Sequence, residues 1–479
     1  MSSSTHATKG TRDSAESSAP RAPQRKRPAA VSSVRLLRLS LGLGLALACV
    51  STRAQERSIT VITGATLIDG TTRPAVQNAV IVMDGGRITH AGATAAVPAG
   101  ATVIDARGKF VIPGLADMHH HLLSGSMRPI VNRQSVLRRM LAVGVTTVFT
   151  PSIWQKDFAA LNAAAAADSA EYARFFGTGP SITVKEDGMG RAEGADAPET
   201  PAEAQAIVRA RKAAGVHAIK IMNDDVSWSS KARVPLMKPE VLSAIVEEAH
   251  RQGLKVFAHA PMLEPAKQVL RAGGDGLMHG IIDQPVDQEF LTLMQRNRAS
   301  YVSTMALYED VGDVAAWGRR QAVNWDKAAL QPPRFYEAFT SPIGVKQFEF
   351  FVNNTEFTKQ HLPVQRANLK TVFDAGIPVV LGTDTGFFGV LVGAATQIEL
   401  ELMVEAGLKP EDALRAATMN AARMLGKEQE LGTVEAGKAA DLVILDADPR
   451  ADIRNVTRIV RTFKGGVPYD PVDSARPVR

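Results

Sequence analysis

Cysteine is nearly absent from this chain of 479 residues, and its absence limits the chemistry available. The single cysteine, Cys49, lies in an N-terminal apolar run, so the chain that follows it contains none. A disulfide within the chain is therefore excluded, and so are thiolate metal ligands in its body. Any metal held there must be bound by nitrogen and oxygen donors.

Net charge of one sign is also missing from most of the chain. The total is +6, but residues 1–54 hold nine Lys or Arg and two acidic residues, a net +7, which leaves −1 for the rest. A near-neutral body does not favour nucleic acid as a partner, and we expect none. The hydrophobic share of 45% and the charged share of 22% are ordinary for a soluble globular protein.

One apolar run stands out, at residues 40–50 with the sequence SLGLGLALACV. It is too short to span a membrane comfortably, and basic sequence rich in Ser, Ala and Pro precedes it, which is typical of a signal peptide. We interpret residues 1–54 as a signal peptide with a disordered lead. We expect the protein to be exported, either to the periplasm or out of the cell, with no stable membrane span in the mature chain. A lipoprotein anchor at Cys49 and an uncleaved N-terminal anchor are the alternatives.

Short strands and turns dominate both ends of the remaining chain. Residues 55–112 contain several strand patterns separated by turn signals such as Asp69-Gly70 and Asp84-Gly85. A second β-rich segment follows at 426–479. We interpret the two segments as parts of one small β-sandwich, with the central domain inserted between them.

The central segment, residues 113–425, alternates apolar strands with helical patterns. This alternation predicts βα units and a parallel sheet, and eight strands suit a (β/α)₈ barrel. The stretch 306–360 is longer than an ordinary loop and rich in aromatic residues, so we expect an insertion with its own helices. The predicted strands are 115–121, 146–150, 174–177, 218–222, 255–260, 276–280, 299–305 and 379–384.

Side chains able to bind metal fall in or at the ends of these strands. His119 and His121 end the first strand, where alternate residues face the same side, so both can face one point while His120 faces away. Each candidate alone has an ordinary explanation, as a hydrogen-bonded core histidine or a helix cap. Together they predict a metal site, because a barrel gathers its strand ends at one face. The further candidates are Lys220, His259, His279 and Asp384.

These motifs resemble those of the amidohydrolase superfamily of metal-dependent hydrolases. Within it, the chain is most similar to the imidazolonepropionase-related branch, which includes Xaa-Pro dipeptidase-like enzymes. The resemblance extends from about Ile59 to Asp470. The motifs that carry it are PGLADMHHH at 113–121, AIK at 218–220, FAHA at 257–260, MHG at 278–280, LGTD at 381–384, LGTVEAGKAADLVIL at 431–445 and FKGG at 463–466.

The resemblance implies two divalent metal ions. His119, His121 and Asp384 would bind the more buried ion, and His259 and His279 the second. Lys220 would be N-carboxylated by CO₂ and bridge the two, because an ammonium repels a dication whereas a carbamate offers two anionic oxygens. Zn²⁺ is the default metal for nitrogen and oxygen ligands, and Mn²⁺ or Co²⁺ can occupy the same set. A homo-oligomer is also implied.

This ligand set predicts hydrolysis of a small-molecule substrate by a hydroxide that bridges the metals, with Asp384 carrying the proton to the leaving group. We favour a C–N amide bond in a dipeptide or an N-acyl amino acid. A lactonase, esterase or phosphotriesterase with the same metals is one alternative. A non-catalytic metal-binding protein on the same scaffold is another.

Four residues are candidate substrate contacts. Asn223, Lys231 and Arg233 follow the fourth predicted strand, and either cation could bind a carboxylate, although solvated surface charge is the more ordinary interpretation. Tyr301 in the seventh strand would suit an apolar acyl or aryl group.

Overall fold

The protein is described here by a computed structural model that covers residues 59–122, 133–167, 171–187, 194–231, 233–322, 354–386, 389–390 and 392–471. All of these residues belong to one compact unit, Glu56–Arg479. The predicted signal peptide, and residues 323–353 of the predicted insertion, lie outside the described residues. Within the described ranges, no helix is long and apolar enough to cross a membrane.

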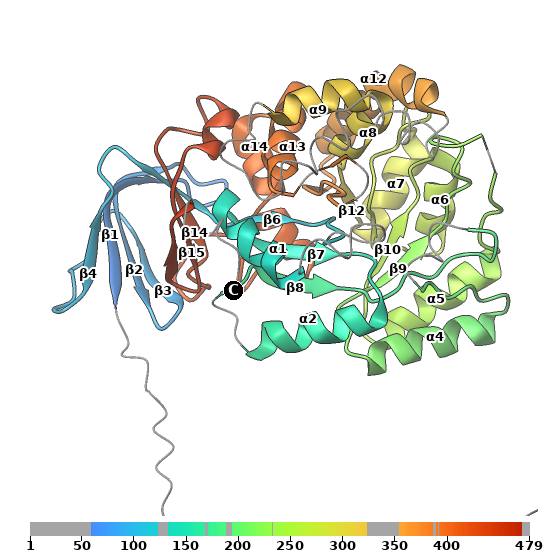
Figure 1. The fold of residues 1–479 in the computed structure, drawn as a ribbon, viewed down its shortest axis with the longest axis horizontal. Helices are drawn as coiled ribbons and strands as arrows, with labels where there is room; N and C mark the ends of the chain where they lie inside the picture. The colour runs from blue at the N-terminus through green and yellow to red at the C-terminus, as the bar shows by residue number, and fades with distance from the viewer. Residues whose placement is uncertain are drawn as a thin grey trace, which may run out of the picture. The chain divides into compact units, whose positions relative to one another are not determined.

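Strands from both ends of the chain pair into one eight-stranded sheet, seen side by side in blue and red in Figure 1. Its order is β16-β15-β14-β5-β1-β2-β3, and β4 pairs with β1. Because these pairings form a single sheet, the sandwich of two stacked sheets stays a prediction. The strands are β1 (Thr60–Leu67), β2 (Val76–Asp84), β3 (Arg87–Gly92), β4 (Thr102–Asp105), β5 (Phe110–Pro113), β14 (Leu442–Leu445), β15 (Ile459–Lys464) and β16 (Val467–Tyr469).

Strand β14 joins the terminal sheet to the central domain. It runs antiparallel to β5, with Leu442 opposite Pro113 and Leu445 opposite Phe110. Successive side chains of a strand face opposite sides. Leu442 and Ile444 accordingly enter the small core of the terminal sheet, whereas Val443 and Leu445 enter the large core of the barrel.

Eight parallel strands form the central domain in the predicted order. Two hydrogen-bonded groups, β6-β7-β8 and β9-β10-β11-β12-β13, account for all eight. The bond from Met118 N to Leu381 O (3.0 Å) joins the first strand to the last, and that from Ile182 N to Lys220 O (2.8 Å) joins the two groups. The strands are β6 (Leu115–Asp117), β7 (Val145–Thr150), β8 (Arg174–Gly177), β9 (Ile219–Met222), β10 (Val256–His259), β11 (Gly276–Leu277), β12 (Ser300–Val302) and β13 (Val379–Val380).

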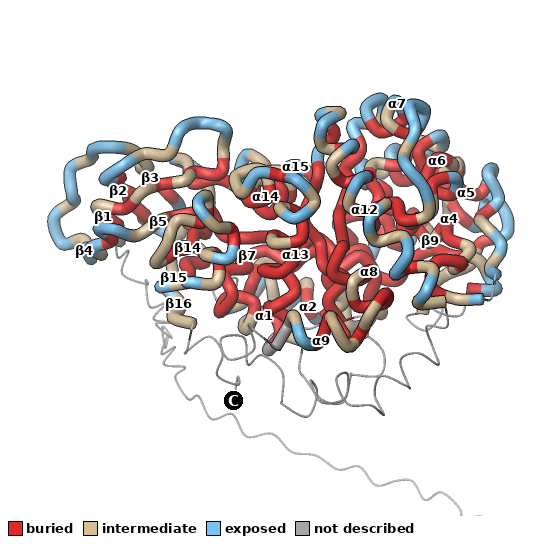
Figure 2. Tube along the Cα trace, turned by 90° about the horizontal axis from the view of Figure 1, so that it is seen from above, coloured by how far each residue is buried: buried red, intermediate tan, exposed pale blue. Residues whose placement is uncertain are grey.

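Helices surround the barrel strands, as Figure 1 shows. Pro201 and Pro239 stand in the first turn of their helices, and Thr200 and Glu203 form a capping box. Figure 2 shows α13 buried along most of its length. The helices are α1 (Arg133–Met140), α2 (Gln155–Ala167), α4 (Pro201–Ala213), α5 (Pro239–Arg251), α6 (Leu263–Arg271), α7 (Gln288–Asn297), α8 (Met305–Gly312), α9 (Val314–Ala322), α12 (Thr355–Asp374), α13 (Ala394–Glu405), α14 (Pro410–Ala416) and α15 (Met419–Met424), with short 3₁₀ turns at Leu141–Val143 and Ile453–Thr457.

The described parts of the predicted insertion are mainly helical. Helices α8 and α9 lie at its start, and α12 begins near its end. The end of the insertion is tied to the loop that follows β9, because Thr358 Oγ1 donates to Trp228 O at 2.7 Å and Asn354 Nδ2 donates to Ser227 O at 2.6 Å. The insertion therefore fixes a loop that begins three residues after Lys220.

We expect Val443→Ala to lower the free energy of unfolding by about 2 kcal/mol, because it removes buried methyl groups from the strand shared by both cores. Val460→Ala is the matched control, since Val460 lies in β15 with 41% of its surface exposed, and a change within about 0.5 kcal/mol is expected there. Urea unfolding followed by circular dichroism measures both. Equal losses in the two variants would contradict the shared position of β14.

Candidate metal centre

Three predicted ligands meet where the first and eighth barrel strands end. His121 Nε2 lies 2.8 Å and His119 Nε2 lies 3.1 Å from Asp384 Oδ1. The two ring nitrogens are 3.2 Å apart. The backbone N–H of Asp384 also donates to His119 O at 2.7 Å, so the pairing of the strand ends itself holds the carboxylate beside the rings.

The hydrogen bonds of His119 show what this group of atoms can hold. Its Nδ1 lies 2.8 Å from Met278 O, and a carbonyl only accepts, so Nδ1 carries the proton. In a neutral ring Nε2 then presents a lone pair, and it faces a carboxylate oxygen and a second imidazole nitrogen. Converging lone pairs repel one another unless a cation lies between them. The donor set therefore fits a metal ion bound by nitrogen and oxygen.

A second pair of histidines lies next to this group. His259 Nδ1 is 2.7 Å from His279 Nε2, and the rings of His119 and His279 are 4.6 Å apart between centroids. One ligand atom from each of His119, His279 and Asp384 falls within 4.8 Å of the others. The site thus offers two adjacent groups of donors, as two metal positions require.

Lys220 is the cation that faces these donors. Its neighbours in β9, Ile219 and Ile221, pack in the core between strands and helices, so Lys220 points to the barrel interior. Only 2% of its surface is exposed. Its charge helps to lower the pKa of both His119 and His279. Lys220 is thus a buried lysine close to His119 and His279.

Burial keeps the imidazoles of His119 and His279 neutral, as metal ligands must be. It lowers the pKa of His119 and His279 well below the ordinary value. Burial alone would raise the pKa of Asp384, but the nearby His119 and His121 lower it below the ordinary value of an aspartate. His120 is also buried, with its pKa lowered to about 3, and its Nδ1 accepts the N–H of Leu122 at 2.9 Å.

Strained backbone surrounds the site. Leu122, Val226, Thr304 and Asp384 all have positive φ, at 45°, 58°, 44° and 61°. Such conformations cost a non-glycine residue about 1–3 kcal/mol each, and they persist only where the surroundings impose them. Asp384 is itself a ligand candidate, Leu122 follows His121, and Thr304 contacts a ligand through its side chain. Precise placement of the donors accounts for this concentration of strain.

Buried carboxylates that the sequence analysis did not single out support the ligands. Asp117 accepts from Thr383 N (3.2 Å) and Oγ1 (2.8 Å) and from Thr396 Oγ1 (3.0 Å), and burial raises its pKa to about 6. It fixes the segment just before Asp384 to the segment just before His119. Asp117 lies two residues before His119, on the same face of the strand, and this spacing could have identified it from the sequence.

Glu399 of α13 supports the site from the other side. Its carboxylate accepts from Ser303 Oγ (2.5 Å), Met305 N (2.9 Å) and Ala306 N (2.7 Å), and burial raises its pKa to about 7. These bonds flank Thr304, whose Oγ1 is 3.0 Å from His279 Nδ1. No local pattern in the sequence marks Glu399, because its partners lie more than 90 residues away.

Two of the predicted substrate contacts, Tyr301 and Asn223, are buried and hydrogen-bonded to backbone. Tyr301 is fully buried in the core between strands and helices, and its hydroxyl accepts from Ile281 N at 2.7 Å. Asn223 is also fully buried. Its amide donates to Pro265 O at 3.1 Å and accepts from Met237 N at 3.0 Å, so both of its polar ends bind backbone. Both residues support the fold through these bonds, and their contact with a substrate stays a prediction.

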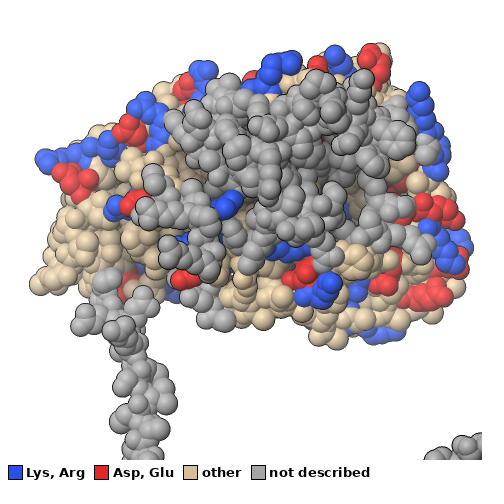
Figure 3. Space-filling model, in the orientation of Figure 1, with Lys and Arg blue, Asp and Glu red and all other residues tan. Residues whose placement is uncertain are grey.

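Lys231 and Arg233 are surface residues of the loop after β9. Arg233 is 61% exposed, and its guanidinium donates to Ser230 O at 3.3 Å and lies 3.7 Å from Asp225. It braces its own loop, which agrees with the surface interpretation. Across the face drawn in Figure 3, positive and negative side chains of the described residues are interspersed, in keeping with a near-neutral body.

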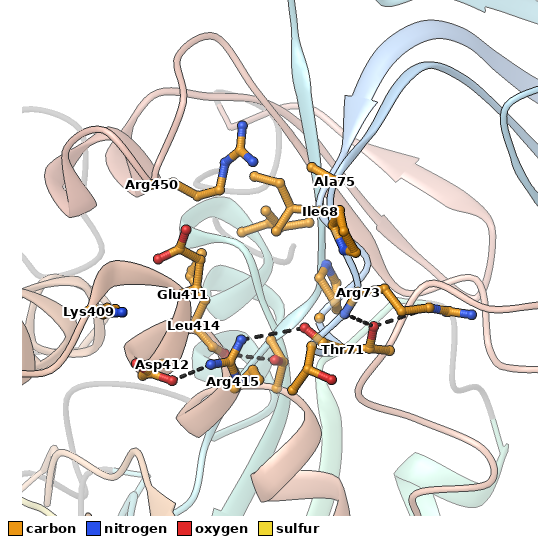
Figure 4. A pocket seen from close by; sticks show the side chains of 16 residues that line it. Ile68, Thr71, Arg73, Ala75, Lys409, Glu411, Asp412, Leu414, Arg415 and Arg450 are labelled. Atoms are coloured by element: carbon orange, nitrogen blue, oxygen red, sulfur yellow. Dashed lines mark hydrogen bonds and ion pairs between the residues drawn. The ribbon is translucent and has the colours of Figure 1, made fainter.

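A cavity of about 420 Å³ lies apart from these ligands, between the terminal sheet and α14 (Figure 4). Arg415 at its wall pairs with Asp412 and reaches Thr71 O at 3.5 Å. Arg450 pairs with Asp448 at 2.8 Å. None of the six candidate ligands is among its lining residues. The cavity therefore lies where the terminal sheet meets the barrel.

A barrel with histidine, lysine and aspartate donors at its strand ends defines a class of metal-dependent hydrolases. The model of the Amidohydrolase family matches residues 110–468, well over half of the chain. The protein belongs to the amidohydrolase family, as the sequence motifs predict.

Individual relatives agree with this assignment. The ochratoxinase of Aspergillus niger is 28% identical over 271 residues, 55% of this chain and 48% of that protein, so the match spans about half of its length. The imidazolonepropionase of Streptomyces avermitilis is 25% identical over 384 residues, 78% of this chain and 81% of that protein. A solved Xaa-Pro dipeptidase with bound methionine has a TM-score of 0.71 at 24% identity, covering 86% of this chain and 100% of that chain, which shows the barrel fold.

The buried carboxylate of Glu399 generates a prediction about stability and pH. In the folded protein the carboxyl group of Glu399 keeps its proton up to about pH 7. In the unfolded chain it releases the proton near the ordinary pKa of a glutamate, 4.5. Stability therefore falls as pH rises through this window, by about 3 kcal/mol for such a shift in pKa. In Glu399→Gln, which cannot ionise, the free energy of unfolding should fall less steeply between pH 4.5 and 7. Urea unfolding across this range measures the slopes, and equal slopes would contradict the raised pKa.

Proposed function

We propose that this protein is a metal-dependent hydrolase with two divalent ions that cleaves a C–N amide bond. The proposed substrate is peptide-like or an N-acyl amino acid. The observation that carries the proposal is the convergence of His119 Nε2, His121 Nε2 and Asp384 Oδ1 beside the His259–His279 pair. Membership of the amidohydrolase family supports hydrolysis as the reaction class.

The chain's own residues account for the two halves of the hydrolysis. When bound, divalent ions supply a Lewis acid and lower the pKa of water toward about 7. Asp384 accepts the proton from the attacking water and passes it to the nitrogen that leaves. The C–N bond breaks, and the products are a carboxylate and an amine. Asp384 is buried, so bulk water has little access to the proton that it carries.

Lys220 would supply the link between the two ions. Its amine adds to the carbon of CO₂, a C–N bond forms and one proton is released, which leaves an anionic carbamate. Of the residues described, Lys220 is the buried lysine whose charge acts on both histidine groups. Zn²⁺ is the proposed metal, since imidazole and carboxylate donors suit it.

We also propose two properties that the sequence led us to expect, export and assembly. Export of the protein is supported by the apolar run and basic lead in residues 1–54. Assembly as a homo-oligomer is supported by the resemblance to the superfamily.

We expect Asp384→Asn to reduce kcat by about 10²- to 10⁴-fold, the usual contribution of a general acid–base group. The substrate comes first from a panel of dipeptides, N-acyl amino acids, lactones, esters and phosphotriesters tested with the zinc-loaded protein. Asp374→Asn, on the exposed end of α12, is the control and should keep full activity. Undiminished turnover in Asp384→Asn would refute the proton-transfer role.

The substrate panel also tests which type of bond the protein hydrolyses. Turnover confined to lactones, esters or phosphotriesters would replace the amidase proposal, and no turnover of any class by the zinc-loaded protein would favour a binding protein.

Lys220→Ala is expected to lower metal content below two equivalents, because the bridging carbamate can no longer form. Short carboxylic acids such as acetate or propionate should restore part of the content by occupying the vacated space. Elemental analysis of dialysed protein measures this, with Lys185→Ala at the exposed Lys185–Glu199 pair as the control. Two full equivalents in Lys220→Ala would contradict the bridge.

A further inference from the structure

Asp224 places a buried carboxylate against a histidine of the second donor group. It follows β9 by two residues, and its side chain is only 2% exposed. Its Oδ2 accepts the indole N–H of Trp228 at 2.8 Å and lies 2.9 Å from His259 Nε2. Its Oδ1 accepts the N–H of Val226 at 3.1 Å.

These contacts determine which nitrogen of His259 carries the proton. An indole N–H and a backbone N–H only donate, so both carboxylate oxygens of Asp224 act as acceptors, toward Trp228 and Val226. His259 Nε2 must then be the protonated nitrogen. Its Nδ1 therefore presents a lone pair, and this atom lies 2.7 Å from Nε2 of His279.

The loop that carries Asp224 is held firmly enough to impose this arrangement. Val226 has a φ of 58°, which the surrounding contacts maintain. Trp228 is 1% exposed, and its carbonyl accepts from Thr358 Oγ1 at 2.7 Å. Asn223 ties the start of the loop to the backbone at Pro265 and Met237. Asp224 thus cannot turn away without breaking several buried hydrogen bonds.

We propose that Asp224 is a positioning residue that holds His259 with Nδ1 free for the second metal ion, and so sets the affinity of that position. The inference rests on the proposed function for the identity of the ligand. Carboxylates that accept the second N–H of a metal-binding histidine orient the ring and raise its basicity. Nothing in the sequence motifs of the barrel required an acidic residue here.

The neighbouring Asp225 provides a matched control. Its Oδ1 accepts from Ser227 N at 2.9 Å and its Oδ2 lies 3.7 Å from Arg233, so it braces the outside of the same loop. Its side chain is 34% exposed, and its contacts lie within the loop. The same Asp→Asn change at positions 224 and 225 separates an effect on His259 from an effect on the loop.

The first experiment titrates metal-free full-length protein with Zn²⁺ and measures bound metal by equilibrium dialysis. Asp224→Asn should weaken the second equivalent by about 10- to 100-fold and leave the first unchanged. Asp225→Asn should bind both equivalents like the original protein. Unchanged binding of the second equivalent in Asp224→Asn would overturn the proposal, and so would equal weakening in both variants.

A further variant tests whether the effect acts through His259. Trp228→Phe keeps an aromatic ring but removes the indole donor, leaving the Asp224–His259 contact in place. It should weaken the second equivalent by less than about threefold if the histidine contact is what matters. Loss as large as in Asp224→Asn would overturn the positioning role, because it would assign the effect to the Asp224–Trp228 contact.

The tautomer can be observed without metal, which separates this inference from the proposed function. In metal-free protein labelled with ¹⁵N-histidine, His259, assigned with His259→Gln, should show protonated Nε2, and Asp224→Asn should change that pattern. Protonated Nδ1 in the original protein would overturn the inference. If the original protein binds fewer than two Zn²⁺, the two-metal proposal fails, while the tautomer still tests the contact.

Discussion

The pairing between the first and last strands of the barrel is the contact on which the site depends. Asp384 N donates to His119 O, and Met118 N donates to Leu381 O. These bonds bring together residues separated by more than 260 positions, and they put the carboxylate of Asp384 against two imidazoles. Asp117 reinforces the same junction through Thr383. Without closure of the barrel, the histidine cluster at 119–121 would have no partner.

Closure of the barrel brings metal-binding donor atoms close together, and the surrounding residues keep them in place. Donors with lone pairs face one another in a buried space, and burial holds the imidazoles of His119 and His279 neutral. Three of the four rings are oriented through their other nitrogen: His119 by Met278 O, His279 by Thr304 and His259 by Asp224. The positive φ values near the ligands show that the backbone accepts strain to keep this arrangement. Rigid placement of this kind prepares the site to bind cations without reorganising.

The terminal sheet contributes to the core of the barrel through β14 and through Ile112 of β5. Strand β14 alternates between the two cores, and Gly114 N donates to Asp441 O at 2.9 Å just where β6 begins. Asp441 also pairs with Arg174 of β8. The sheet therefore anchors the first barrel strand, whose other end carries His119 and His121.

The sequence by itself determined the class of fold, the order of the eight barrel strands and the six candidate ligands, because strand and turn patterns are local and parallel strands gather their ends at one face. It did not single out Asp117, Asp224 or Glu399, and it did not predict the buried hydrogen bonds of Tyr301 and Asn223. Only the tertiary structure decided these roles, since burial and hydrogen-bond partners arise from contacts between segments distant in the chain, such as Glu399 with Ser303. An aspartate after a strand resembles an ordinary loop residue until the fold places a histidine 2.9 Å from it.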